Sequence, residues 1–158
     1  MRTPCVLVIL FLTLSYSTLA QKKTSLLFLK AKGTFSYPIK NVSEINTYSI
    51  RKNICDGDFG SKKTVFYTDS SCVVSAVFNG KVRTVTMVED FYVIITEFEG
   101  YFLTYSGVID PIVKKGDSIK TGQLISSTGK DLDDRFCVEI YLSTATKDID
   151  PFPWFKSK

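Results

Sequence analysis

The sequence contains no histidine among its 158 residues. Histidine is the side chain that most often moves protons near neutral pH, so its absence excludes serine–histidine and cysteine–histidine nucleophile systems. The chain also lacks a glycine-rich loop of the kind that cradles phosphate and has no internal repeat. Neither charge sign dominates, because 20 Lys and Arg face 16 Asp and Glu. The basic residues are scattered along the chain, which argues against a nucleic-acid partner.

The N-terminus has the pattern of a secretory signal peptide. Arg2 is followed by an apolar run over positions 6–14, and small residues end at Ala20. That run is too short to span a bilayer. We therefore expect residues 1–20 to be removed, leaving a secreted or periplasmic protein of the bacterial envelope without a transmembrane segment. Residues 21–34 form an N-terminal linker or edge segment, and residues 35–158 form one β domain.

Three cysteines would remain after processing: Cys55, Cys72 and Cys137. An exported protein can form disulfides, and Cys55 and Cys72 are the nearest pair in sequence. Alternatively, all three are small buried apolar residues. The sequence leaves both readings open.

Short apolar segments separated by turn residues predict an all-β fold, a meander of mainly antiparallel strands. Strands are expected at 47–50, 64–68, 82–88, 91–98, 101–105 and 136–142. The pair Asn79-Gly80 predicts a two-residue hairpin turn, and turns are also expected at Glu89-Asp90 and Glu99-Gly100. The polar, glycine-containing residues 51–63 predict a loop. No helix is expected after the signal peptide.

The stretch from Val113 to Ile125, VKKGDSIKTGQLI, predicts a compact β corner. Gly116 and Gly122 lie where the turns require positive φ. Biotinyl and lipoyl carrier domains have a similar corner, but they present a modifiable lysine in a motif that this chain lacks.

Several pieces occur in a characteristic order: VxAVFNGKV from Val74, the glycine corner, FCVEI from Phe136, and DPFPWF from Asp150. This ordered set resembles the lysostaphin/LytM-type zinc metallopeptidases over about residues 37 to 155. The resemblance implies a β-sandwich, or barrel-sandwich hybrid, built from a duplicated hybrid motif. It also implies descent from murein endopeptidases.

The resemblance further implies a zinc site, and every position that would form it is altered. The metal-binding histidine of the downstream motif matches Cys137, and the upstream histidine and aspartate fall near Ser61 and Val65. The two histidines that assist the attacking water match Arg135 and Gly107. A catalytic zinc takes about three protein ligands, and arginine cannot act as a base at neutral pH. We therefore expect no catalytic residue, no metal ligand and no cofactor.

The function implied is that of a catalytically inactive, murein-peptidase-like envelope protein. Its remnant groove, with Tyr105, Arg135, Cys137 and Glu139, would bind a peptidoglycan peptide or regulate a cell-wall hydrolase. One alternative is a divergent zinc endopeptidase acting on peptidoglycan, because the segment CDGD from Cys55, together with Cys137, offers a Cys/Asp/Cys ligand set. Another is a structural module of the envelope.

Overall fold

The computed structural model describes residues 26–54 and 57–157 of the chain. The expected signal peptide and Cys55 lie outside the described residues. Residues 26–30 form a short helical segment, closed by a hydrogen bond from the Ala31 N–H to the Leu27 carbonyl. This part of the expected linker is therefore helical, as its leucine-rich sequence favours, and is not an edge strand. Among the described residues, no helix has the length and apolarity needed to cross a membrane.

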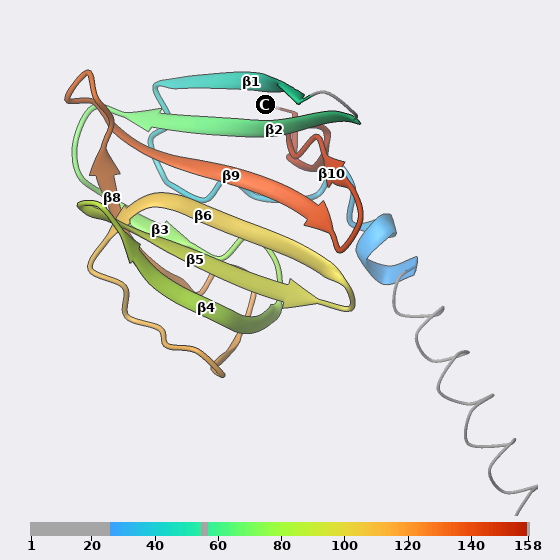
Figure 1. The fold of residues 1–158 in the computed structure, drawn as a ribbon. Helices are drawn as coiled ribbons and strands as arrows, with labels where there is room; N and C mark the ends of the chain where they lie inside the picture. Colours follow the sequence, from blue (N-terminus) through green and yellow to red (C-terminus); the bar gives the residue numbers. More distant parts are fainter. Residues whose placement is uncertain (1–25, 55–56, 158) are drawn as a thin grey trace, which may run out of the picture. The chain divides into compact units, whose positions relative to one another are not determined.

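Residues 32–158 form a separate compact unit, and the described part of it is organised around one antiparallel sheet (Figure 1). The sheet has ten strands, with eight in the order β1-β2-β9-β8-β6-β5-β4-β7, while β3 pairs with β8 and β10 with β9. The predicted all-β, antiparallel fold is confirmed. The strands are β1 (Glu44–Ile54), β2 (Gly57–Thr68), β3 (Val73–Ser75), β4 (Gly80–Val88), β5 (Phe91–Phe98), β6 (Tyr101–Ile109), β7 (Ser118–Ile119), β8 (Leu124–Lys130), β9 (Phe136–Thr144) and β10 (Asp148–Ile149).

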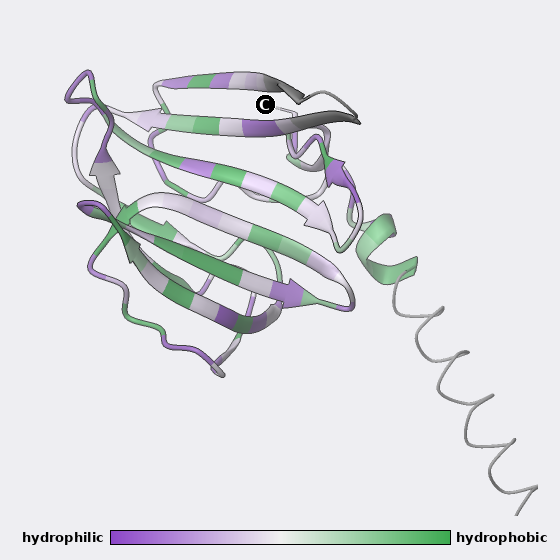
Figure 2. Cartoon of the chain, in the orientation of Figure 1, coloured by the Kyte–Doolittle hydropathy of each residue, from purple (hydrophilic) through white to green (hydrophobic). Residues whose placement is uncertain are grey.

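The side chains of strand β9 point alternately into the core and onto the open face of the sheet. It pairs with β2 along one edge, and with β6 and the end of β8 along the other. Its side chains alternate, as those of a half-buried strand must, and Figure 2 shows the alternating hydropathy. Val138, Ile140 and Leu142 are buried on the core side, while Cys137 and Glu139 belong to the opposite face. Every residue that β9 gives to a surface site therefore shares that second face.

An aromatic cluster closes the C-terminus against the core, as the sequence predicts. The short 3₁₀ helix η1 (Phe152–Trp154) places Trp154 beside Phe35, with ring centroids 5.6 Å apart. Phe155 stacks edge-on against Phe66 at 4.8 Å. The backbone joins the two ends of the unit, because the Phe35 N–H donates to the Trp154 carbonyl at 2.9 Å.

The glycine corner is confirmed. Gly116 has a φ of 99° and Gly122 a φ of 80°. The corner lies along β4, since the Gly116 N–H donates to the Val82 carbonyl and the Val82 N–H donates to the Asp117 carbonyl, both at 2.8 Å. These bonds fix the segment that leads into β8 and hence into one rim of the site described below.

The predicted hairpin at Asn79-Gly80 is wrong, because β3 and β4 do not pair with each other. Gly80 is instead the first residue of β4, and a Cβ there would lie 3.0 Å from the Glu97 carbonyl oxygen of β5. Glycine is needed for this close backbone approach. The Asn79 side chain accepts a hydrogen bond from the Thr121 N–H at 2.9 Å and so ties this bend to the glycine corner.

The predicted loop over residues 51–63 is also wrong. Strands β1 and β2 form a long hairpin through this region, with Ile50 opposite Ser61 and Thr47 opposite Thr64. The sequence of the segment has no clean alternation of apolar residues, so the strand pairing that its backbone makes was not visible in the pattern. The brief strand expected at 47–50 is therefore only the middle of β1.

Candidate binding groove

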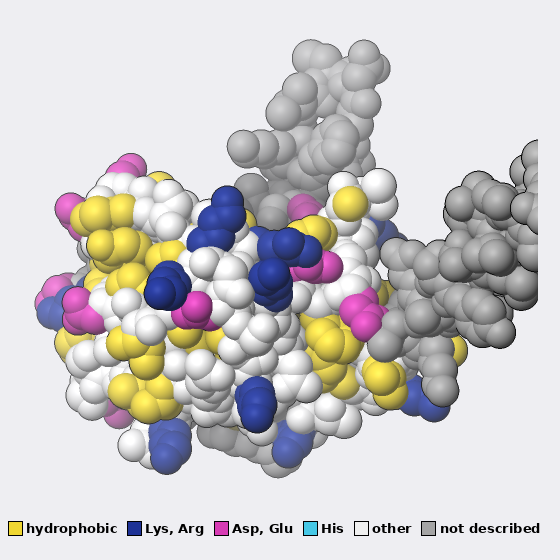
Figure 3. All heavy atoms as spheres, turned by 90° about the horizontal axis from the view of Figure 1, so that it is seen from below, with side chains coloured by type: hydrophobic (Ala, Val, Ile, Leu, Met, Phe, Trp, Pro, Cys, Tyr) yellow, Lys and Arg dark blue, Asp and Glu magenta, His cyan; other side chains and the backbone are white. Residues whose placement is uncertain are grey.

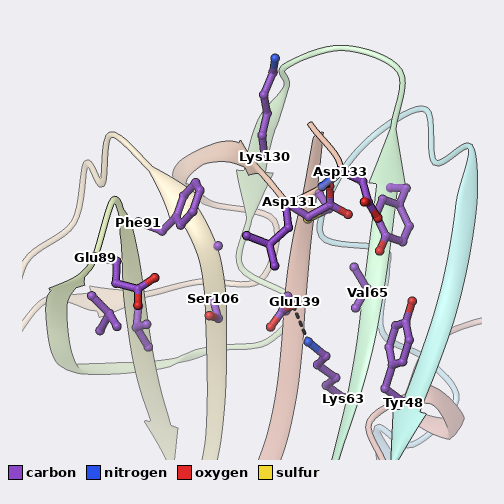
Figure 4. A pocket seen from close by; sticks show the side chains of 16 residues that line it. Tyr48, Lys63, Val65, Glu89, Phe91, Ser106, Lys130, Asp131, Asp133 and Glu139 are labelled. Atoms are coloured by element: carbon purple, nitrogen blue, oxygen red, sulfur yellow. Dashed lines mark hydrogen bonds and ion pairs between the residues drawn. The ribbon is translucent and has the colours of Figure 1, made fainter. Parts of the chain in front are cut away.

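The open face of the sheet carries a groove of about 470 Å³. Its floor comes from neighbouring strands β2, β9, β6 and β5. Its two rims are the loop between β8 and β9, on one side, and the turn between β4 and β5, on the other (Figure 4). The floor residues are Lys63, Val65, Val93, Ser106, Gly107, Cys137 and Glu139.

An ion pair occupies the centre of the floor. The Lys63 ammonium donates to Glu139 Oε1 at 2.5 Å, and the Tyr141 hydroxyl donates to Glu139 Oε2 at 2.8 Å. Burial raises the pKa of Tyr141 above its usual value, and the hydrogen bond to the carboxylate raises it further. Both carboxylate oxygens are thus engaged by neighbours, so Glu139 is not available as a free base.

Two positions that the resemblance matches to metal ligands, Cys137 and the neighbourhood of Val65, belong to one buried cluster. Val65, Tyr67 and Cys137 form a buried cluster, with exposed fractions of 2%, 6% and 3%. Tyr67 lies directly opposite Cys137 in the strand register, and Val65 lies opposite Glu139. Burial raises the pKa of the Cys137 thiol to about 11, and the charges of Asp131 and Glu139 add to the effect. Without a metal, the thiol is therefore protonated at neutral pH and is a poor nucleophile.

The described residues at the positions that the resemblance matches to metal ligands do not fit a zinc ion. Ser61 and Val65 lie four positions apart on the continuous strand β2, which corresponds to roughly 13 Å between them. Two ligands of one zinc ion lie far closer than that. In the part of the chain that the structure describes, no group of three or more His, Cys, Asp or Glu side chains could hold a metal ion. Cys55 and Asp56 of the alternative ligand set lie outside that part, and Cys72 is a free thiol.

Arg135 lies at the edge of the groove and not on its floor. Its guanidinium stacks on the Tyr67 ring at 3.9 Å, and it donates to Glu44 at 3.2 Å and to Asp131 at 3.4 Å. The two carboxylates compensate its charge. Arg135 therefore covers the end of the Val65–Tyr67–Cys137 cluster. It lines an adjoining hollow and not the groove itself.

Tyr105 does not line the groove. It is fully buried on the core side of β6, and its hydroxyl accepts a hydrogen bond from the Val77 N–H at 2.9 Å. Its neighbours Ser106 and Gly107 line the groove in its place. Of the four expected groove residues, the structure thus brings Cys137 and Glu139 together on the floor and puts Arg135 at the border.

Sequence reasoning missed Lys63, Tyr141 and the rim residue Asp131. Lys63 falls in the segment assigned to a loop, so its place beside Val65 and Tyr67 on one strand face was not recognised. Extending the alternation of β2 backwards from Tyr67 would have placed Lys63, Val65 and Tyr67 together.

The β8–β9 rim is held rigidly by Asp131. Its Oδ1 accepts the backbone N–H groups of Asp133 and Arg135, both at 3.0 Å. Partial burial raises the pKa of Asp131, but these two backbone bonds and the Arg135 charge outweigh it and lower the pKa below the usual value. The loop is therefore a fixed turn with an ionised carboxylate at its base.

Figure 3 shows one face of the molecule, on which basic side chains are spread out with acidic ones among them. This face carries no continuous basic stripe of the kind that follows a nucleic-acid backbone.

No family model matches the sequence, and no curated protein matches it. Solved structures do match. A chain of the SpoIIQ–SpoIIIAH pore-forming complex aligns over 79% of this chain and 92% of its own length, with a TM-score of 0.61 and 16% identity. Csd3 of Helicobacter pylori aligns over 78% of this chain, with a TM-score of 0.59 and 15% identity, and only 35% of Csd3 is covered.

The catalytic domain of the antimicrobial peptidase lysostaphin from Staphylococcus simulans also aligns. It covers 72% of this chain and 92% of the lysostaphin chain, with a TM-score of 0.55 and 19% identity. At these identities the likeness establishes the fold and nothing more. The fold expected from the sequence motifs is confirmed: this chain, which has no histidine, has the β fold of the LytM-type peptidases.

Proposed function

We propose that this chain is a catalytically inactive LytM-type domain of the bacterial envelope. Its groove binds a cell-wall peptide or a cell-wall hydrolase. The observation that supports this most directly is the buried Val65–Tyr67–Cys137 cluster. It includes two positions that the resemblance matches to metal ligands, while an open groove of about 470 Å³ remains beside it.

Hydrolysis of a peptide bond needs an activated water and a group that moves protons. The chain has no histidine, the Cys137 thiol is protonated at neutral pH, and Glu139 is held by Lys63 and Tyr141. What the groove retains is a partly apolar floor with fixed polar groups, which is the usual character of a ligand site.

The test combines binding, metal content and cleavage. Purified protein should be retained by purified sacculi or by a cell-wall hydrolase, and Ser106→Trp should abolish that retention by filling the groove floor. Ile112→Trp is the matched control, because Ile112 is 68% exposed and lies outside the groove. Circular dichroism should show both variants folded.

The same protein should contain far less than one zinc per chain and should cleave neither murein nor pentaglycine peptides. Near one zinc per chain, with chelator-sensitive cleavage that Cys137→Ala removes, would establish the divergent endopeptidase instead. Retention by neither sacculi nor hydrolases would leave the structural envelope module.

A further inference from the structure

The charges of the groove are unbalanced in a chain that is basic overall. Four carboxylates and two amines line it, a net formal charge of −2, whereas the whole chain carries +4. Neither amine neutralises the negative charge of the carboxylates on the rims. Lys63 is paired with Glu139 on the floor. Lys130 pairs with Asp134 at 2.7 Å, outside the groove, and lies over the Phe136 ring.

Two rim carboxylates form no salt bridge in the described part of the chain, and Asp133 shares the charge of Arg135 with Asp131 and Glu44. Glu89 belongs to the β4–β5 turn and Asp133 to the β8–β9 loop, and both are exposed. Figure 4 shows them on opposite sides of the groove, with Ser106 and Glu139 between them. A ligand lying in the groove would therefore meet acidic side chains on each side, with the guanidinium of Arg135 shared by three carboxylates, Glu44, Asp131 and Asp133.

Each of these carboxylates adjoins an exposed apolar side chain. Leu132, next to Asp133, is fully exposed, and Val88, next to Glu89, is 53% exposed. The exposure of Leu132 does not come from a loose loop. The two backbone hydrogen bonds to Asp131 hold that turn. Phe91 lies below Val88 as part of the groove lining. Each rim therefore offers an apolar side chain beside an acidic one, and a partner that covered both would bury apolar surface as well as pair charge.

We propose that the groove and its two rims bind a segment of a partner protein that carries both basic and apolar side chains. This inference rests on the proposed function and names its partner. The basic side chains would meet Glu89 and Asp133, and the apolar ones would pack on Val88, Phe91 and Leu132. The groove leads past Ser106 and Val93 into a second hollow of about 300 Å³, which suits an extended segment.

A cell-wall peptide fits these rims less well. Its free carboxylates would face Glu89 and Asp133 with the same sign of charge, and the glycan attached to it would leave Leu132 without an apolar partner. Charge complementarity therefore favours a basic protein segment over a wall fragment.

The test uses two end-capped, fluorescent seven-residue peptides, one alternating lysine with leucine and the other alternating glutamate with leucine. Fluorescence polarisation should show the lysine peptide binding at least about tenfold more tightly, with an affinity that falls as salt is raised. The double variant Glu89→Lys, Asp133→Lys should lose about tenfold or more of that affinity. Leu132→Ser should lose severalfold, without any folding cost at a fully exposed position.

Asp110→Lys is the matched control for Glu89→Lys. Both residues are exposed acidic residues at positive φ, 49° for Asp110 and 55° for Glu89, but Asp110 lies outside the groove. Its substitution should leave the affinity unchanged.

Three results would overturn the inference. Equal binding of both peptides, still blocked by Ser106→Trp, would remove the charge preference but leave a binding groove. Purified muropeptides that bind more tightly than the lysine peptide and are insensitive to Glu89→Lys would identify a wall ligand. Self-association of the protein that Leu132→Ser abolishes would identify a second copy of the chain as the occupant.

Discussion

Replacing Tyr105 by phenylalanine should destabilise the fold without weakening binding in the groove. The hydroxyl of Tyr105 accepts the Val77 N–H at 2.9 Å inside the core. Phenylalanine fills nearly the same space but leaves this buried N–H without its acceptor. An unsatisfied buried donor costs about 1–3 kcal/mol, which for a domain of this size lowers the melting temperature by roughly 3–6 °C per kcal/mol.

The effect should depend on pH in a defined direction. Burial raises the pKa of Tyr105 well above its ordinary value, against a smaller opposite effect of the Val77 hydrogen bond. The unfolded chain therefore loses the Tyr105 proton above about pH 10, while the folded chain keeps it. The stabilisation is complete below pH 10 and is lost as pH rises, by about 1.4 kcal/mol at one unit above that value. The difference between wild type and Tyr105→Phe should shrink by this amount between pH 8 and 11.

Urea denaturation followed by tyrosine or tryptophan fluorescence measures both quantities. Tyr92→Phe serves as the control, because Tyr92 is only half-buried and the substitution should change the free energy of unfolding by no more than about 0.5 kcal/mol. The reasoning fails if Tyr105→Phe leaves the stability unchanged at pH 8 but abolishes retention by sacculi or hydrolases. That outcome would put the hydroxyl in the groove, where the sequence resemblance expected it.

Three further predictions concern stability and reactivity. Gly129→Ala should destabilise the protein by about 1–3 kcal/mol, because its Cβ would lie 2.6 Å from the Gly107 carbonyl oxygen and 2.8 Å from the Phe91 ring; an unchanged urea midpoint would contradict this close approach. Gly116→Val should cost about 1–3 kcal/mol through backbone strain at a φ of 99°, and calorimetry showing no change would refute the assigned turn. In the native protein at pH 8, iodoacetamide should modify Cys137 far more slowly than after unfolding, because the thiol is 3% exposed and its pKa is about 11. Peptide mapping measures both rates, and equal rates would show that the cluster around Cys137 is open.

The strands between positions 82 and 105 could be predicted because each has an apolar alternation and a distinct turn beside it. Glu99 and Gly100, for example, both adopt positive φ in the expected turn. Asn79-Gly80 misled the prediction for a physical reason. The dipeptide has the local chemistry of a hairpin turn, but its glycine serves a backbone approach to β5 that only tertiary structure reveals.

The groove was predicted only in part, because the resemblance assigns positions in a motif without assigning faces of a strand. Glu139 and Cys137 are two apart on β9 and so share a face, which the sequence indicates. Tyr105 has a hydroxyl suited to a groove, yet its place in β6 puts it opposite Ile140, on the core side. Lys63 was not predicted to be a groove residue because its segment was assigned to a loop. That segment pairs in the β1–β2 hairpin, but its sequence shows little hydrophobic periodicity.

The positions that the resemblance matches to metal ligands lie on the open face of the sheet, so the fold does not depend on a metal there. Val65 and Cys137 face away from Val138 and Ile140, which pack inward from the same pair of strands. An open sheet face that binds nothing is usually polar, because it is solvated. Instead, the floor here combines a buried apolar cluster with a fixed ion pair, and the turn at Asp131 holds Leu132 in full contact with solvent. Solvent alone gives no stabilisation to such an arrangement, since exposed apolar surface is unfavourable in water. A bound partner that covers Leu132 and Val88 would bury this apolar surface and would also meet the acidic side chains of both rims, and on these two grounds together we propose the rims as its contact surface.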